Sequence, residues 1–494
     1  MADTALHIDY KALYEESQVA VMQLRHELDQ LKKMIFGAKQ ERFVPGNPTD
    51  PAQLSMGLTA EQVNATSLVR AKKIEYTRTE AILTNPVTTH PGRMKLPDHL
   101  ERKEILVDVE GKEGCREIGR EVTEELEYEP GRLYVNRYIR PKYVSADNTT
   151  ILIAPMPERP LPKAIAGPGL LAQIVIDKYV DHLPLHRQQQ RFAREHINIP
   201  YSTITDWVSN TCQLITPLYQ ALQKQVLASD YLHADETPIK VLDKDKKGET
   251  HRGYFWVYHN SLQDMVFFDY RPGRGREGPS ELLKDFRGHL QTDGYAAYNI
   301  FNTQKDVTLL HCMAHARRKF IESRLNDEDR SDYALAQIQQ LYAIERKAAD
   351  DELSEADVLA LRQQEALPIL ESLGKWMKQA YIEVLPKSAI GKALAYSIER
   401  WPQLMIYARD GKLNIDNNPV ERCLRPVAVG RKNYLFAGSH EAAQRSAMLY
   451  SLLGTCKLQG VNPFTWLKNV LEVIPAHPIN KIQELLPCTR ELSI

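Results

Sequence analysis

Three acidic residues far apart in the chain have settings typical of metal-dependent chemistry on phosphate esters. They are Asp235 in Tyr-Leu-His-Ala-Asp-Glu-Thr-Pro, Asp293 in His-Leu-Gln-Thr-Asp-Gly-Tyr, and Glu421 in Asn-Asn-Pro-Val-Glu-Arg. Carboxylate oxygens are the ligands that Mg²⁺ and Mn²⁺ prefer. Two such ions about 3.5–4 Å apart can activate a water or a 3′-hydroxyl and stabilise the leaving oxygen. If the fold gathers the three acids, we expect them to hold two Mg²⁺ or Mn²⁺ ions.

Each acid also has an ordinary structural explanation. Aspartate is disfavoured inside a strand, so Asp235 needs a partner, and a hydrogen bond would serve as well as a metal. Asp293 precedes a glycine, where a turn or cap residue is the usual interpretation. Asn418 as N-cap, Pro419 at the first helical position and Glu421 at the third match a capping box. A helix N-terminus favours a carboxylate, so capping and metal binding by Glu421 are compatible.

The elements that must position these acids alternate between strands and helices. The predicted strands are Tyr231–Ile239, Tyr254–Tyr258, Met265–Tyr270, His289–Gln291 and Val307–Cys312, and the predicted helices are Gly278–Phe286 and Tyr295–Phe301. Three strands in a meander, followed by alternating strand and helix, indicate a mixed sheet with helices on its faces. Residues 320–412 are helical in character and charged, which predicts a helical insertion between the second and third acids.

The preceding half of the chain is predicted to contain four smaller parts. Residues 1–43 contain a short heptad seam, which predicts a coiled coil or an amphipathic helix packed on its own domain. The seam consists of Tyr14, Val21, Leu24, Leu28, Leu31 and Ile35. Residues 44–95 are predicted to form a linker, and residues 96–160 a small β unit. Residues 161–225 resemble a helix-turn-helix, with Ser202 or Thr203 as N-cap of its second helix.

Composition and charge are compatible with several function classes. The 494 residues include 63 basic and 64 acidic ones, a net charge of −1, so any nucleic-acid contact must use local basic patches. No apolar run approaches the roughly 18–20 residues of a membrane span, and we expect no signal peptide. Six scattered cysteines without a Cys-x-x-Cys pair favour reduced thiols. We therefore expect a cytoplasmic protein, which would be nucleoid-associated if it binds DNA.

The contexts of the three acids resemble those of DDE transposases of the IS-sixty-six insertion-sequence family. Four further stretches match: Ile-Phe-Gly-Ala-Lys-Gln-Glu-Arg-Phe at 35–43, Asp-His-Leu-Pro-Leu-His-Arg-Gln at 181–188, His-Cys-Met-Ala-His-Ala-Arg-Arg-Lys-Phe at 311–320, and Gly-Arg-Lys-Asn-Tyr-Leu-Phe-Ala-Gly-Ser at 430–439. The resemblance covers most of residues 20–475. It implies an α/β multidomain protein whose RNase H-like core spans 226–319 and 413–455, with a C-terminal helical region at 456–494. It also implies that Asp235, Asp293 and Glu421 are the catalytic metal ligands.

The sequence departs from the family at a cysteine-rich zinc module. Family members usually carry one before the helix-turn-helix, whereas here Cys115 remains and Tyr143-Val-Ser-Ala-Asp stands in place of the second pair. Structural zinc needs four ligands, so no zinc is expected. Cys312 and His315 have Cys-x-x-His spacing, and we interpret them as a structural pair, a buried thiol beside a histidine.

Basic and hydroxyl side chains give candidate DNA contacts. The candidates are Ser202, Thr203 and Thr205 in the helix-turn-helix, and Arg317, Arg318, Lys319, Arg422, Arg425, Arg431 and Lys432 beside the second and third acids. Such residues could neutralise phosphates, although part of the set could be ordinary surface charge. The glycine- and arginine-rich loop at 271–278 lacks Gly-Lys-Ser/Thr, so it is not predicted to be a nucleotide-binding P-loop.

The sequence favours a transposase that binds the terminal inverted repeats of its element and cleaves and transfers DNA strands. Two alternatives stay open: a structure-specific nuclease on the same core, and a non-catalytic DNA-binding or scaffold protein. The expected partners are transposon-end and target DNA, a second copy of the chain through the N-terminal helix, and accessory proteins of the same element. The end sequence, target preference and pathway do not follow from these residues.

Overall fold

The computed structural model describes residues 96, 98, 100–108, 116–129, 131–145, 149–162, 164–242 and 249–487. The predicted coiled coil, the linker and Cys115 lie outside these residues, and so does the motif at 35–43. Within the described ranges, no helix is long and apolar enough to cross a membrane.

A four-stranded sheet forms where the small β unit was predicted. Its strands are β1 (Arg102–Leu106), β2 (Arg116–Glu129), β3 (Arg132–Val144) and β4 (Ile151–Ile153). The order is β1-β3-β2, with β4 also paired to β3. β2 and β3 form a long antiparallel hairpin, and β1 runs parallel to β3. The carboxylate of Glu127 accepts the N–H of Leu170 at 3.0 Å, which joins this sheet to the helix that follows.

Four helices connect the β unit to the central sheet. They are α3 (Pro168–Tyr179), α4 (Leu185–Arg194), α5 (Tyr201–Leu214) and α6 (Thr216–Leu227). The two helices predicted around a short break are α4 and α5. The predicted N-cap was wrong, because α5 begins at Tyr201 after Pro200, and no side chain caps it. Proline suits this position because its φ is already helical and it has no N–H to satisfy.

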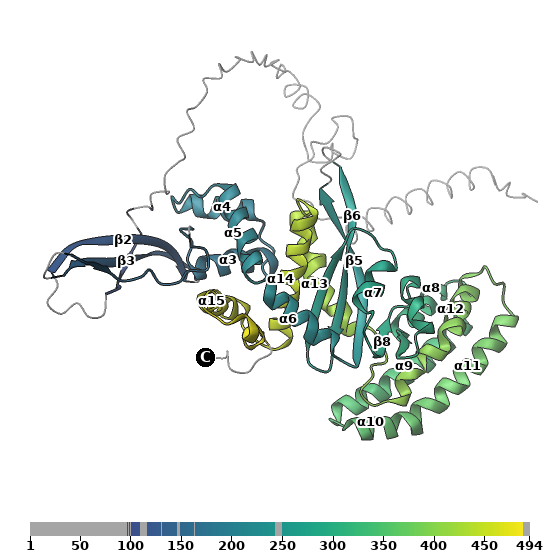
Figure 1. The fold of residues 1–494 in the computed structure, drawn as a ribbon. Coiled ribbons are helices and arrows are strands. Elements are labelled where there is room, and N and C mark those ends of the chain that lie inside the picture. The colour runs from purple at the N-terminus through teal and green to yellow at the C-terminus, as the bar shows by residue number, and fades with distance from the viewer. Residues whose placement is uncertain are drawn as a thin grey trace, which may run out of the picture. The chain divides into compact units, whose positions relative to one another are not determined.

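The central sheet has the strand order β7-β6-β5-β8-β9. Its strands β5, β6 and β8 are labelled in Figure 1. Its strands are β5 (Tyr231–Leu242), β6 (Thr250–Asn260), β7 (Met265–Arg271), β8 (Gly288–Thr292) and β9 (Val307–His311). β5, β6 and β7 pair antiparallel, whereas β8 is parallel to β5 and β9 is parallel to β8. All five strands predicted from sequence are present. The connections between β7 and β9 contain α7 (Glu277–Leu282) and the 3₁₀ helix η2 (Ala296–Thr303).

Helices from the end of the chain pack on this sheet. They are α13 (Asn418–Tyr434), α14 (His440–Leu458), α15 (Pro463–Val473) and the 3₁₀ helix η5 (Ile479–Leu485). α13 contacts β5 and β6, and α14 contacts β7. Edge strand β7 donates Val266 N–H to the Thr455 hydroxyl at 3.2 Å and Phe268 N–H to the Ser451 hydroxyl at 2.8 Å. These bonds satisfy backbone groups that an open sheet edge would leave unpaired.

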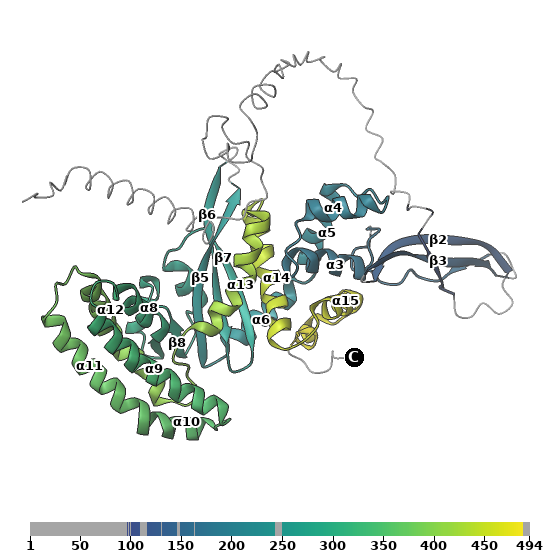
Figure 2. The same ribbon diagram turned by 180° about the vertical axis from the view of Figure 1, so that it is seen from behind.

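A helical block interrupts the chain between β9 and α13, as predicted (Figure 2). It comprises α8 (Met313–Ser323), α9 (Glu328–Asp350), α10 (Glu355–Leu361), the π-helical turn η3 (Arg362–Ala366), α11 (Leu367–Ile382), α12 (Ala389–Leu404) and the 3₁₀ helix η4 (Ile406–Arg409). Its core is a separate apolar cluster that includes Leu341, Leu370 and Leu394. The insertion contacts the sheet through α12 and β9.

Candidate active site

Strand register places the first two acids side by side. β5 and β8 are adjacent parallel strands in which His233 is opposite Gln291. Asp235 and Asp293 each follow two residues later, so they occupy matching positions where β8 ends. Adjacent strands lie about 4.8 Å apart, and residues two apart share a face. The carboxylates of Asp235 and Asp293 therefore project from neighbouring backbones at the same end of the sheet.

A buried asparagine fixes the start of α13 against β5. Asn417 donates its side-chain amide to the carbonyl of Ala234 at 2.9 Å, and its oxygen accepts Nδ1–H of His233 at 3.0 Å. Its backbone N–H is donated to Cys312 Sγ at 3.2 Å. Asn417 is fully buried and lies one helical turn before Glu421. The third acid is thus attached to the strand that carries the first.

Asn417 was not predicted to be a site residue, although it belongs to the Asn-Asn-Pro motif before Glu421. The capping box predicted at the same place was also wrong. Asn417, not Asn418, is the N-cap, and no side chain caps α13. Glu421 is therefore the fourth residue of α13, still in its first turn, and not the third as a capping box requires. Its Oε1 is buried and has no hydrogen-bond partner among the described residues.

His315 on α8 faces Glu421. Its Nδ1 lies 3.9 Å from Glu421 Oε1, and it also lacks a hydrogen-bond partner in the described part of the chain. Burial lowers the pKa of His315, while the nearby carboxylates of Asp293 and Glu421 oppose that shift. Glu421 thus lies close to His315, and the charge of Asp293 acts on the same imidazole.

Mutual repulsion among the acids appears most strongly at Asp235. Burial raises the pKa of its carboxyl well above the usual value, and the charges of Glu236, Asp293 and Glu421 raise it further. One hydrogen bond opposes this shift, from the Glu236 N–H to Asp235 Oδ1 at 2.7 Å. The three acids are thus close enough to interact through a poorly solvated medium. A cation would relieve their repulsion.

Glu236 is a fourth acid at the site, and it was not among the residues predicted from sequence. Its Oε1 accepts a hydrogen bond from Arg274 at 2.9 Å, and its buried Oε2 has no partner among the described residues. Arg274 comes from the glycine- and arginine-rich loop and stacks on the ring of Tyr295, 3.9 Å from its centroid. The glycine- and arginine-rich loop therefore supplies a counter-charge to Glu236.

A tighter group of possible metal ligands consists of Cys312, His315 and Glu421, whose ligand atoms lie within 4.8 Å of one another. Burial raises the pKa of the Cys312 thiol to about 12. A neutral thiol that already accepts a backbone N–H is a poor metal ligand, because metals bind the thiolate. In the described ranges, no three carboxylates are this close together. A metal ion can bridge two carboxylates whose oxygen atoms are not in contact with each other.

Comparisons with known proteins agree with the motifs. The family model described as "Transposase IS66 family" matches residues 163–445, more than half of the chain. Models described as "IS66 C-terminal element" and "Transposase C of IS166 homeodomain" match residues 451–488 and 23–105. The chain is 30% identical to the uncharacterized protein y4hP of Sinorhizobium fredii, over 94% of this chain and 88% of that relative. It is 29% identical to the uncharacterized protein y4jD of the same organism, over 96% of this chain and 95% of that relative.

The chain belongs to the IS66 transposase family. This confirms the resemblance to the IS-sixty-six family, and membership implies a transposase or nuclease enzyme with DNA as a partner. The homeodomain-type match covers residues 23–105, not the helix pair α4 and α5.

The candidate DNA contacts of this transposase-family chain lie in two different kinds of environment. Arg431 donates to the Thr237 hydroxyl and to the Pro238 carbonyl, both at 3.0 Å, so it ties α13 to β5. Lys319 pairs with Glu322 at 2.9 Å. The other candidates are exposed or partly exposed: Ser202, Thr203, Thr205, Arg317, Arg318, Arg422, Arg425 and Lys432. Thr205 also has a protein partner, because its hydroxyl donates to the Tyr201 carbonyl at 2.9 Å. The remaining members of the second set are therefore better suited to phosphate than Arg431, Lys319 and Thr205.

Gly294 is predicted to be required for the position of Asp293. Its φ is +90°, and an added Cβ would lie 2.9 Å from Arg400 Nε. Gly294→Ala should cost about 1–2 kcal/mol of stability, because non-glycine residues are strained in that region. It should also reduce DNA strand cleavage about tenfold by shifting the neighbouring carboxylate. Urea unfolding and single-turnover cleavage measure the two effects. Gly438→Ala, where the added Cβ meets nothing within 4 Å, is the control.

His233 is predicted to make stability depend on pH. It is fully buried between Asn417 and Asn414, and burial lowers its pKa from 6.5 to about 3. Asn414 donates its amide to Nε2 at 3.1 Å, so a second ring proton would meet a donor. The unfolded chain therefore binds this proton more readily, and the contribution of His233 to stability is lost as pH falls from 6.5 towards 3.

Between pH 7 and pH 5 the loss should be about 2 kcal/mol from this group alone. Urea denaturation at the two pH values measures it. His233→Gln should be less stable at pH 7 but should have a smaller difference between the two pH values. An unchanged difference would show that other groups cause the pH dependence.

Proposed function

We propose that this chain binds the terminal inverted repeats of its insertion sequence and catalyses metal-dependent cleavage and transfer of DNA strands. Asp235, Asp293 and Glu421 would be the metal ligands. The observation that supports this best is the parallel register of β5 and β8, together with the attachment of α13 through Asn417. The order β7-β6-β5-β8-β9 is that expected for an RNase H-like core, which is part of the proposal.

The donors at this site fit Mg²⁺ or Mn²⁺. All candidate ligands offer carboxylate oxygens, the hard donors that these ions select. Glu421 Oε1 and Glu236 Oε2 are buried without a hydrogen-bond partner in the described ranges, and the raised pKa of Asp235 indicates too little positive charge nearby. When bound, two ions would neutralise these acids and stabilise the charge that develops on the phosphodiester.

The side chains of the proposed site would position the substrate in two successive steps. A water would be the first nucleophile and the freed 3′-hydroxyl the second, with the same carboxylates serving both. Arg318 is exposed near His315, and Arg422 is exposed near His233. Each arginine acts electrostatically on the histidine beside it. They are suited to contact phosphates of the bound strand, which would make affinity depend on salt.

The test uses the full chain, DNA carrying the element's ends, and Mg²⁺ or Mn²⁺. Wild type should yield cleaved and joined products, whereas Asp235→Ala, Asp293→Ala and Glu421→Ala should yield neither and should still bind the ends. Normal strand transfer by one variant would remove that residue from the proposed site. Nicking without joined products by the wild type would favour a nuclease.

Assembly on paired ends is a further part of the proposal. A coiled coil at residues 1–43 would join two copies, and accessory proteins of the element would act with them. Light scattering with and without end DNA measures the mass. A monomer under both conditions would exclude this mode of assembly.

A further inference from the structure

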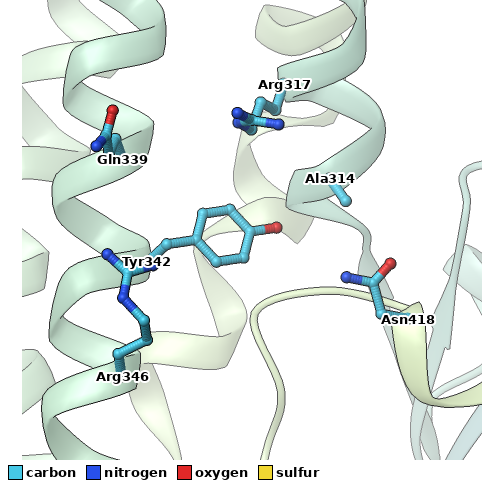
Figure 3. Close-up of a pocket in the computed structure, with 6 residues that line it drawn as sticks. All are labelled: Ala314, Arg317, Gln339, Tyr342, Arg346 and Asn418. Atoms are coloured by element: carbon cyan, nitrogen blue, oxygen red, sulfur yellow. The ribbon is translucent and has the colours of Figure 1, made fainter.

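A polar hollow of about 400 Å³ lies beside the candidate active site, outside the set of carboxylates. Its lining residues are Ala314 and Arg317 from α8, Gln339, Tyr342 and Arg346 from α9, and Asn418 from α13 (Figure 3). Three elements thus meet there: the helix that carries His315, the first long helix of the insertion, and the helix that carries Glu421. Ala314 precedes His315, and Asn418 lies three residues before Glu421, so the hollow adjoins the acids.

Two arginine side chains line the hollow, and neither forms an ion pair with a carboxylate of the described residues. Arg317 and Arg346 are both exposed, and neither has an ion pair or a hydrogen bond within the described part of the chain. In contrast, the neighbouring Lys347 pairs with Glu365 at 2.9 Å. Guanidinium groups on two facing helices are suited to successive phosphates of one strand, because each can donate two parallel hydrogen bonds to a phosphate.

Tyr342 supplies a fixed aromatic face between the two arginines (Figure 3). Its hydroxyl donates to Asp416 Oδ2 at 2.8 Å, and Asp416 also accepts the side-chain amide of Asn418 at 2.6 Å. The carboxylate of Asp416 is buried, with its oxygens occupied by these donors and by the Asn418 N–H at 3.0 Å. Tyr342 and Asn418 are therefore held in place before any ligand arrives.

We propose that this hollow binds one unstacked nucleotide of the DNA, next to the phosphodiester cut at the carboxylates. The two phosphates that flank it contact Arg317 and Arg346, and its base lies on the ring of Tyr342. Gln339 and Asn418 offer amide groups to the base edge. Bases stack on aromatic rings in single strands regardless of sequence, and basic residues follow the backbone. The helical insertion thereby contributes part of the substrate site. This inference rests on the proposed function.

Binding of single strands tests the two halves of the proposal separately. The probes are a fluorescein-labelled oligothymidylate of ten nucleotides and the matching abasic strand. Binding of each probe to the full chain is measured in the presence of Ca²⁺. Tyr342→Leu should weaken binding of oligothymidylate about tenfold and leave the abasic strand unaffected. Arg317→Ala with Arg346→Ala should weaken both probes and lower the salt slope by about 1.4. Tyr342→Phe, which keeps the ring, should bind oligothymidylate more tightly than Tyr342→Leu.

The matched control is Lys387→Ala with Lys392→Ala, which removes the same charge from exposed positions elsewhere on the insertion. If the arginine pair behaves like this control, or if Tyr342→Leu binds both probes as wild type does, the proposal is wrong. Melting temperatures within about 2 °C of wild type establish that the variants are folded.

Photocrosslinking locates the nucleotide and separates this proposal from the proposed function. End duplexes carry 5-iododeoxyuridine at single positions on either side of the cut. A crosslink to the peptide that contains Tyr342 supports the hollow, and the position that gives it distinguishes the transposon end from the flanking DNA. Crosslinks confined to other peptides overturn it. A protein that crosslinks there but never cleaves or joins DNA would refute the proposed function alone. One that joins DNA without this crosslink would refute the hollow alone.

Discussion

Asp235→Asn is expected to abolish DNA strand cleavage and joining and to raise the melting temperature of the metal-free protein. The proposed site needs this carboxylate as a metal ligand, so the rate should fall by at least about 10³-fold. Stability should change in the opposite direction. Burial and the charges of Glu236, Asp293 and Glu421 raise the pKa of Asp235, so its ionised form destabilises the fold. The neutral amide removes that repulsion.

The gain should be about 1 kcal/mol, or roughly 2–4 °C in melting temperature. Differential scanning fluorimetry with and without Mg²⁺ or Mn²⁺ measures it. Metal should raise the wild-type melting temperature and should have little effect on Asp235→Asn. Asp306→Asn, an exposed position before β9, controls for the loss of one carboxylate and should leave activity unchanged. Wild-type joining activity in Asp235→Asn would disprove its role.

Asn417→Ala is expected to reduce cleavage about 10²-fold although it removes no metal ligand. Asn417 holds the start of α13 against β5 through Ala234 and His233, both fully buried. Without it, Glu421 loses its fixed position, and a displacement of about 1 Å can cost this factor. The Ala234 carbonyl and His233 Nδ1–H would also lose their partners, which should cost about 2–4 kcal/mol of stability.

Two measurements separate positioning from simple unfolding. Thermal unfolding identifies a temperature at which Asn417→Ala is fully folded, and cleavage is then measured at that temperature. Higher metal concentration should restore part of the activity, because weaker ligand geometry lowers metal affinity. Asn433→Ala, near the other end of α13, controls for loss of an amide on the same helix. A folded Asn417→Ala with wild-type cleavage would contradict the positioning role.

Local sequence predicted much of the fold correctly. The pattern of apolar residues predicted the five strands between 231 and 312. A strand that is buried on one or both faces shows this pattern within a few consecutive residues, so local sequence is enough to find it. The helical block between the second and third acids follows from its uninterrupted helix-forming composition. Errors arose at element ends. Ser202 and Thr203 do not cap α5, and Asn418 does not cap α13, because a preceding Pro200 and Asn417 set those starts.

The sequence by itself determined the family, the main elements and the three acids as candidates. Only the tertiary structure decided that Asp235 and Asp293 occupy matching positions on adjacent strands, and that Asn417 attaches Glu421 beside them. It also assigned Arg274 to Glu236, and Arg431 to the Thr237 hydroxyl and the Pro238 carbonyl of β5, which removes Arg431 from the candidate DNA contacts. These pairings join residues 38 to 194 positions apart. Such partners depend on the path of the whole chain, because a buried polar group bonds to whichever backbone the fold brings within about 3 Å.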